Sequence, residues 1–246
     1  MKIHLLSAYL TGQICLRHPI DLEALLLDAR FRLEGEDSLK RPLECLKLQD
    51  DIPLASMSFL IPAAFGGVSQ MEIARIRGLH TRTRGEQIHV TKNMPRALTF
   101  VDTMSPYRSE LAKYPQLTGV DRLCWYFTGD AERVLDLARE IDWLGPMRNA
   151  GFGEVREWTL EEADASLTTP WIDRGHLLRR LPATTTAPIH EERRPAPEHA
   201  PLRPPYWAKD NCQFVLIPNI AAMIDYGRIA LQSNVAEKTD EVVYYG

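Results

Sequence analysis

The sequence is poor in the features that mark membrane proteins, disulfide-rich proteins and zinc proteins. Its 246 residues include four cysteines, and no two of them form a Cys-x-x-Cys pair. No apolar run approaches the roughly 18 uninterrupted residues that a membrane-spanning helix needs. Residues 1–5 are typical of a β-strand and lack the pattern of a signal peptide. We therefore expect a cytoplasmic protein with reduced cysteines and no structural metal.

Motifs for catalysis are also missing. The sequence contains no Gly-x-Ser-x-Gly and no His-Glu-x-x-His pattern, which mark serine hydrolases and zinc proteases. Two acid pairs, Asp50-Asp51 and Glu161-Glu162, consist of adjacent residues, which point to opposite faces of a strand or lie about 100° apart on a helix. Such pairs are typical of solvated turns. We expect no catalytic residue, no bound metal and no cofactor.

The charges are unevenly distributed along the chain. The net charge of −4 argues against a protein that coats nucleic acid, because phosphate binding depends on many basic groups. Residues 73–97 nevertheless carry six arginines and lysines against Glu86 alone. These basic residues are Arg75, Arg77, Arg82, Arg84, Lys92 and Arg96. One basic segment in an acidic protein indicates local contact with a polyanion, although a hairpin with solvated charges explains it equally well.

The order of the predicted elements indicates an α+β fold. Periodicity predicts a central strand within residues 3–16, a helix from Asp21 to Gly35, strands at 54–61, 120–127 and 154–160, and a helix over 131–143. Asp21 and Asp130 are the predicted N-caps of the two helices. This order is that of a ferredoxin-like (RRM-like) βαββαβ module.

We predict an insertion between the two halves of this module, at about 66–103. Its strands, at 73–77 and 87–91, form a basic β-hairpin that turns near Arg84 and Gly85. The module with its insertion spans residues 1–160. Residues 161–246 form a C-terminal extension whose proline-rich stretch, 182–205, is expected to be a surface wrap or a linker.

A glycine-rich loop connects the second predicted helix to the last strand. Its candidate RNA-binding residues are Gly145, Arg148, Asn149, Gly151, Phe152 and Gly153. Glycines allow close approach of another chain, arginine suits phosphate, and an aromatic ring can stack on a base. A nucleotide-binding loop runs from a strand through glycines into a helix. This loop runs from a helix into a strand, so we exclude a nucleotide-binding loop here. Helix capping by glycine explains Gly145 well and the other two glycines poorly.

The loop and its surroundings resemble the RAMP superfamily of CRISPR proteins, which are built from ferredoxin-like folds with a glycine-rich loop after the second helix. The matching residues are Leu144, Gly145, Arg148, Trp158 and the run 151–155. The segments Leu10-Thr11-Gly12, Pro19-Ile20-Asp21 and 56–62 look like the Cas-five-type subunit of type IV systems. The resemblance covers about residues 1–160.

This resemblance implies a subunit that binds the 5′ handle of the guide RNA and caps one end of a ribonucleoprotein effector filament. An inserted hairpin, called a thumb, would bend the RNA. Its partners would be guide RNA, the backbone subunit of the filament and target DNA near the protospacer-adjacent motif. The basic residues of 73–97, with His80 and His89, would contact RNA beside the loop.

Two other functions remain open at this point. Some relatives are metal-independent endoribonucleases that use a histidine with tyrosine or lysine, and this chain offers His4, His18, Tyr107 and Lys113. No two histidines have a telling spacing, so we expect a non-catalytic role. The second alternative is a ferredoxin-like assembly module without a nucleic-acid role. Tyr206 and Trp207 could stack a base or pack on protein.

Overall fold

The computed structural model describes residues 2–35, 41, 43–63, 67–77, 110–202 and 211–240 of the chain. Of residues 74–77, 110–113 and 233–240 it describes the backbone alone. The fold is α+β, with antiparallel sheets and few helices in the part described. Within that part, no helix is both long and apolar enough to cross a membrane.

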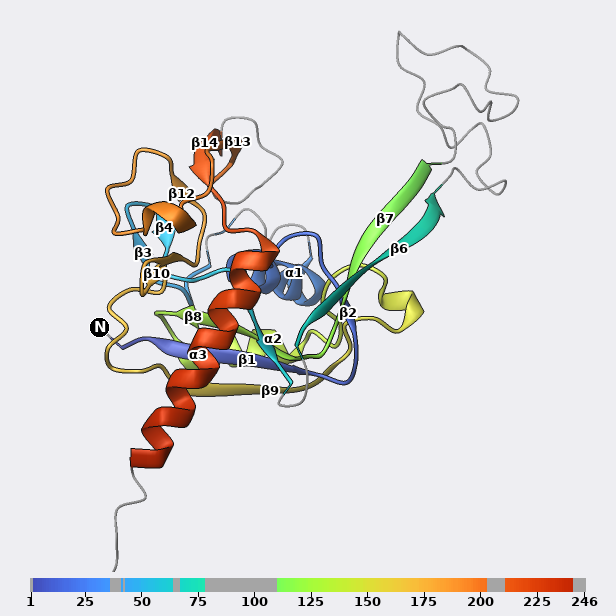
Figure 1. Cartoon of the computed structure of the whole chain (residues 1–246), viewed down its shortest axis with the longest axis horizontal. Helices are drawn as coiled ribbons and strands as arrows, with labels where there is room; N and C mark the ends of the chain where they lie inside the picture. Colours follow the sequence, from blue (N-terminus) through green and yellow to red (C-terminus); the bar gives the residue numbers. More distant parts are fainter. Residues whose placement is uncertain are drawn as a thin grey trace, which may run out of the picture.

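The centre of the molecule is a four-stranded antiparallel sheet in the order β5-β8-β1-β9 (Figure 1). Its strands are β1 (His4–Leu10), β5 (Phe59–Pro62), β8 (Val120–Phe127) and β9 (Val155–Glu162). Leu6 of β1 lies opposite Trp125 on one side and Leu160 on the other. The apolar strand predicted within residues 3–16 is thus a central strand, followed by the short β2 (Ile14–Cys15).

Two helices cover one face of this sheet, the face of Leu6 and Trp125. They are α1 (Leu22–Glu34) and α2 (Ala131–Arg139). Their buried residues join Trp125 in one core. Helix α2 places its apolar side chains on one stripe, whereas α1 also exposes Phe31 and Leu33. The indole N–H groups of Trp125 and Trp158 donate to the carbonyls of Ile20 (2.8 Å) and Ile141 (3.0 Å), at the start of α1 and just after α2.

The predicted caps are correct in position but differ in chemistry. Asp130 accepts a hydrogen bond from the backbone N–H of Arg133 at 3.1 Å, as an N-cap should. Asp21 precedes α1, but its carboxylate makes no capping hydrogen bond. It is instead paired with Arg180 at 2.6 Å. The Asp21 carboxylate therefore binds Arg180 and does not cap α1, which is the role that the sequence predicted for it.

A long hairpin projects from one end of the sheet (Figure 1). Its described arms are β6 (Ser69–Arg77) and β7 (Glu110–Thr118), which pair in antiparallel register. The described part of the second arm starts at Glu110, so the predicted boundary at about 103 lies outside the described residues. The predicted strand 87–91, and the turn near Arg84 and Gly85, lie outside the described residues.

The C-terminal part of the chain is more ordered than a linker. Residues 171–217, called the C-terminal lobe below, contain two small sheets and two small apolar clusters. The strands are β10 (Ile172–Asp173), β11 (His176–Leu177), β12 (Leu181–Pro182), β13 (Glu198–Pro201) and β14 (Cys212–Leu216), with a 3₁₀ turn, η4, at Glu191–Arg193. Ile189 and Leu202 anchor the proline-rich stretch by burial. Strands β3 (Leu48–Gln49) and β4 (Ile52–Pro53) lie against the lobe, since Ile52 packs with Val215.

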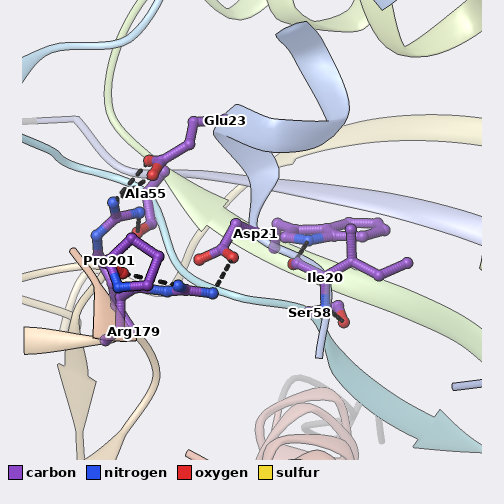
Figure 2. Close-up of polar contacts among 9 residues, drawn as sticks. Ile20, Asp21, Glu23, Ala55, Ser58, Arg179 and Pro201 are labelled. Atoms are coloured by element: carbon purple, nitrogen blue, oxygen red, sulfur yellow. Dashed lines mark hydrogen bonds and ion pairs between the residues drawn. The ribbon is translucent and has the colours of Figure 1, made fainter. Parts of the chain in front are cut away.

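Two consecutive arginines fasten the lobe to the start of α1. Arg179, fully buried, donates to Glu23 at 2.7 Å and to the Ala55 carbonyl at 3.1 Å (Figure 2). Arg180 donates to Asp21 and to the carbonyl of Pro201. Burial raises the pKa of Asp21 to about 6, against the lowering effect of the Arg180 charge.

The final helix, α3 (Ile220–Asp240), was not predicted from the sequence. It packs on the sheet face opposite α1 and α2. Tyr226 contacts the rings of Phe59 and Tyr126, at centroid distances of 5.0 and 6.5 Å. Its hydroxyl donates to Asp173 at 2.7 Å, so this one residue joins α3, the central sheet and the lobe.

Candidate nucleic-acid interface

The glycine-rich loop is a closed protrusion between α2 and β9. Leu144 N–H donates to the Gly153 carbonyl at 2.7 Å, and Gly153 N–H donates to the Gln13 carbonyl at 2.8 Å. A short 3₁₀ turn, η3 (Arg148–Ala150), forms the tip. The base of the loop is therefore fixed to the segment that links β1 and β2, while its tip faces outward.

The three glycines have different roles in this loop. Gly145 has φ +73°, and a Cβ there would lie 2.5 Å from the Cys15 carbonyl oxygen. Gly153 has φ +78°, and a Cβ there would collide with the Leu144 carbonyl. Gly151 also has positive φ, but nothing lies within 4 Å of its Cβ position. The chain's own backbone thus crowds Gly145 and Gly153, whereas Gly151 is favoured by its positive φ alone and has open space at its Cβ position.

The remaining loop residues present polar groups to solvent. Arg148 and Asn149 are exposed, and Phe152 is half-buried. Arg148 donates through Nε to the Gly145 carbonyl at 3.2 Å. Within the described residues its two Nη groups make no hydrogen bond. The guanidinium is thereby oriented by the loop while most of its donors stay available for an anion.

The loop and the hairpin meet at one end of the molecule (Figure 1). Strand β2 pairs with β7, Ile14 opposite Leu117 and Cys15 opposite Gln116. Leu16 N–H donates to the Pro115 carbonyl at 3.0 Å. Residues 11–16 therefore contact both the glycine-rich loop and the base of the hairpin, and bring the two predicted sites together.

Most of the predicted basic residues of the hairpin lie outside the described residues. Arg75 and Arg77 lie on β6, opposite Ala112 and Glu110 of β7, in the part where the backbone alone is described. The others are outside the described residues: His80, Arg82, Arg84, His89, Lys92 and Arg96. Their contact with RNA stays a prediction.

Of the candidate general bases, the structure describes the side chains of His4 and His18, and these lie on separate segments. His4 lies in β1, packed 5.4 Å from the ring of Phe127, and burial lowers its pKa. His18 is exposed in the connection before α1. Tyr107 is outside the described residues, as are Tyr206 and Trp207. In the described ranges, no cluster of three or more His, Cys, Asp or Glu side chains could hold a metal ion.

Sequence reasoning missed one group of polar and aromatic residues near the loop. The Tyr9 ring, at the end of β1, has the guanidinium of Arg122 at 5.0 Å and that of Arg156 at 5.9 Å from its centroid. These residues come from three strands that are neighbours only in the folded sheet. The sequence offered one signal for this group: the predicted strands 120–127 and 154–160 each contain an arginine, Arg122 and Arg156.

Comparison with known proteins identifies the family. No curated protein matches this chain. The family model described as CRISPR type IV associated protein Csf3 matches residues 71–218, from β6 to the end of the C-terminal lobe. This range includes the hairpin, the glycine-rich loop and the lobe, and it extends beyond the residues 1–160 covered by the resemblance seen in the sequence. Since the match spans more than half of the chain, the chain belongs to the Csf3 family of CRISPR type IV associated proteins.

Proposed function

We propose that this chain is the non-catalytic, guide-RNA-binding subunit of a cytoplasmic type IV CRISPR effector, and that it holds the 5′ handle of the guide. The observation that carries the proposal is the junction at residues 11–16, which joins the glycine-rich loop to the base of the hairpin. A strand of RNA that follows this junction would meet Arg148 and then the basic segment 73–97.

The topology supports placing the chain in the RAMP superfamily as a Cas-five-type subunit. Strand order β5-β8-β1-β9, with α1 after β1 and α2 after β8, supports the proposal that these elements form a ferredoxin-like module. The loop follows the second helix, as in that superfamily. The hairpin leaves the module between β5 and β8, where a thumb would be inserted.

The electrostatics support a local grip on RNA. The chain as a whole is acidic, with net charge −4, so nonspecific binding over its surface is disfavoured. Basic groups that neutralise phosphates release counterions, and each contact adds about 0.7 to the salt slope for a single strand. In a complete effector the filament's backbone subunit and target DNA would be the further partners.

The test is binding of labelled guide RNA to the purified chain at several salt concentrations. Arg148→Ala is expected to weaken binding about 10-fold, since it removes one charge-assisted contact. The Arg82→Ala/Arg84→Ala/Lys92→Ala variant should lower the salt slope by about 2. The matched control removes three exposed basic residues elsewhere, Arg32, Lys47 and Arg133. Equal affinity and slope in the test and control variants would reject the proposed interface.

Catalysis is tested in a separate reaction. The pure protein is incubated with labelled repeat RNA in the absence of metal. We expect the RNA to remain intact, because no two histidines of the sequence have a spacing typical of a catalytic site. One discrete cut near the handle would contradict the non-catalytic role.

A further inference from the structure

The central sheet has one face that α3 covers only in part. Side chains alternate along a strand, so Leu5, Ser7 and Tyr9 of β1 share the face opposite α1 and α2. On this face α3 packs against Phe59 and Tyr126, on the β5 and β8 side. Tyr9 lies at the other end of β1, beside the edge strand β9.

A β-bulge directs an extra arginine toward Tyr9. Tyr9 pairs with Glu157 and Leu10 with Val155, so Arg156 has no partner in the β1–β9 register. Bulges bend a strand and re-aim the side chain of the extra residue. The guanidinium of Arg156, an exposed residue, approaches the Tyr9 ring, and Arg122 also donates a hydrogen bond to the Tyr9 hydroxyl. The result is a half-buried ring with two guanidinium groups near it.

This group lies next to the glycine-rich loop. Thr11 N–H, two residues after Tyr9, donates to the Glu154 carbonyl at 3.0 Å, and Glu154 directly follows Gly153. A single-stranded RNA that runs from the glycine-rich loop toward the central sheet would therefore pass over the Tyr9 ring. Aromatic rings and guanidinium planes are the surfaces on which unpaired RNA bases stack.

We propose that Tyr9, with Arg122 and Arg156, forms a stacking site for one unpaired base of the bound RNA. This inference rests on the proposed guide-RNA function and adds a subsite to it. The cross-strand neighbour of Tyr9 is the exposed Glu157, which repels phosphate and can accept a hydrogen bond from an exocyclic amino group, as carboxylates do with cytosine. The site therefore takes a base, and prefers the bases with an exocyclic amino group, cytosine and adenine among them, to uracil.

The first experiment compares variants of the full chain in binding to labelled guide RNA. Tyr9→Ala should weaken binding about 5- to 150-fold, the range of one lost base stack. Tyr9→Phe keeps the ring and removes the bond to Arg122, so its affinity should stay within about twofold of wild type. Phe214→Ala removes an exposed aromatic residue of the C-terminal lobe and serves as the matched control. If Tyr9→Ala binds as tightly as wild type, the stacking site is overturned.

The second experiment needs no variant, so it stands even if Tyr9→Ala fails to fold. Ultraviolet crosslinking of wild-type protein to guide RNA, followed by peptide mapping, should mark Tyr9. Crosslinks that avoid the peptide containing Tyr9 while wild-type protein binds would overturn the site and leave the proposed function intact. Absence of any RNA binding by wild-type protein would reject the proposed function and the site with it. Replacing cytosine and adenine in the handle by uracil should lower affinity, and equal affinity would refute the role of Glu157.

Discussion

At the scale of single residues, the ion pair between Arg179 and Glu23 is the most deeply buried pair in the described part of the chain. The two side chains have 0% and 1% of their surface exposed, and they lie 2.6 Å apart. Removing charges from water is costly, and the mutual attraction offsets this cost only while both partners are present. The pair therefore specifies how the C-terminal lobe meets α1 more than it stabilises the fold.

Replacing one partner should be much more harmful than replacing both. Arg179→Met is expected to lower the free energy of unfolding by about 3–5 kcal/mol, because it leaves the Glu23 carboxylate buried without its partner. Arg179→Met/Glu23→Leu should recover most of this loss. Urea denaturation of the two single variants and the double variant gives the coupling free energy. Additive effects of the two substitutions would show that the charges do not interact.

At this scale the sequence predicted which side chains would be functional in the fold, but it did not predict which residues they would contact. Asp130 was predicted as a cap and is one, because capping depends on neighbours three residues away. Asp21 has the same local pattern, but its partner Arg180 is 159 residues away along the chain. No local pattern can reveal such a pair. The Tyr9 group escaped for the same reason, since its three members meet only through sheet register.

At the scale of elements, prediction succeeded where one periodicity dominated. Helix α2 has an apolar pattern of a single period, and α1, α2 and β8 were predicted within a few residues of their ends. The strand predicted within residues 3–16 is divided into β1, which ends at Leu10, and β2. Helix α3 was missed because its apolar residues are not confined to one face and because Gly227 lowers its helix propensity. The short strands of the lobe, two to five residues long, have too few positions to show alternation.

Gly227 also offers a test of how α3 docks. A Cβ at this position would collide with the Leu60 carbonyl of β5. In an isolated helix, Gly→Ala is stabilising by about 1 kcal/mol. Here Gly227→Ala should instead destabilise the protein by about 1–3 kcal/mol, because the helix must move off the sheet. Thermal unfolding measures the change, and Gly12→Ala, where nothing lies within 4 Å, is the control. A gain in stability for Gly227→Ala would mean that α3 packs differently.

At the scale of the whole molecule, stability should depend on the proton at Asp21. Burial raises its pKa from 3.8 to about 6. Between about pH 4 and pH 6 the folded protein holds a proton that the unfolded chain has lost. The contribution of Asp21 to the free energy of unfolding therefore has its largest value below about pH 4. It falls by up to about 3 kcal/mol as the pH rises, and it is lost above about pH 6.

The measurement is denaturation of wild type and Asp21→Asn at several pH values. The difference between the two curves should change across the window from pH 4 to pH 6 and be flat above it. Since many other carboxyl groups titrate nearby, this difference is the quantity to follow. A difference independent of pH would show that Asp21 keeps its ordinary pKa in the fold.

The buried arginines also have a consequence for protein synthesis. Glu23 leaves the ribosome 156 residues before Arg179, a delay of about 8–30 s at usual elongation rates. During this interval the two acids at the start of α1, Asp21 and Glu23, have been synthesised and their partners Arg180 and Arg179 have not. The N-terminal half of the polypeptide therefore cannot complete its core until the C-terminal lobe has left the ribosome. A nascent chain that stalls before Arg179 would bind chaperones and be degraded by proteases.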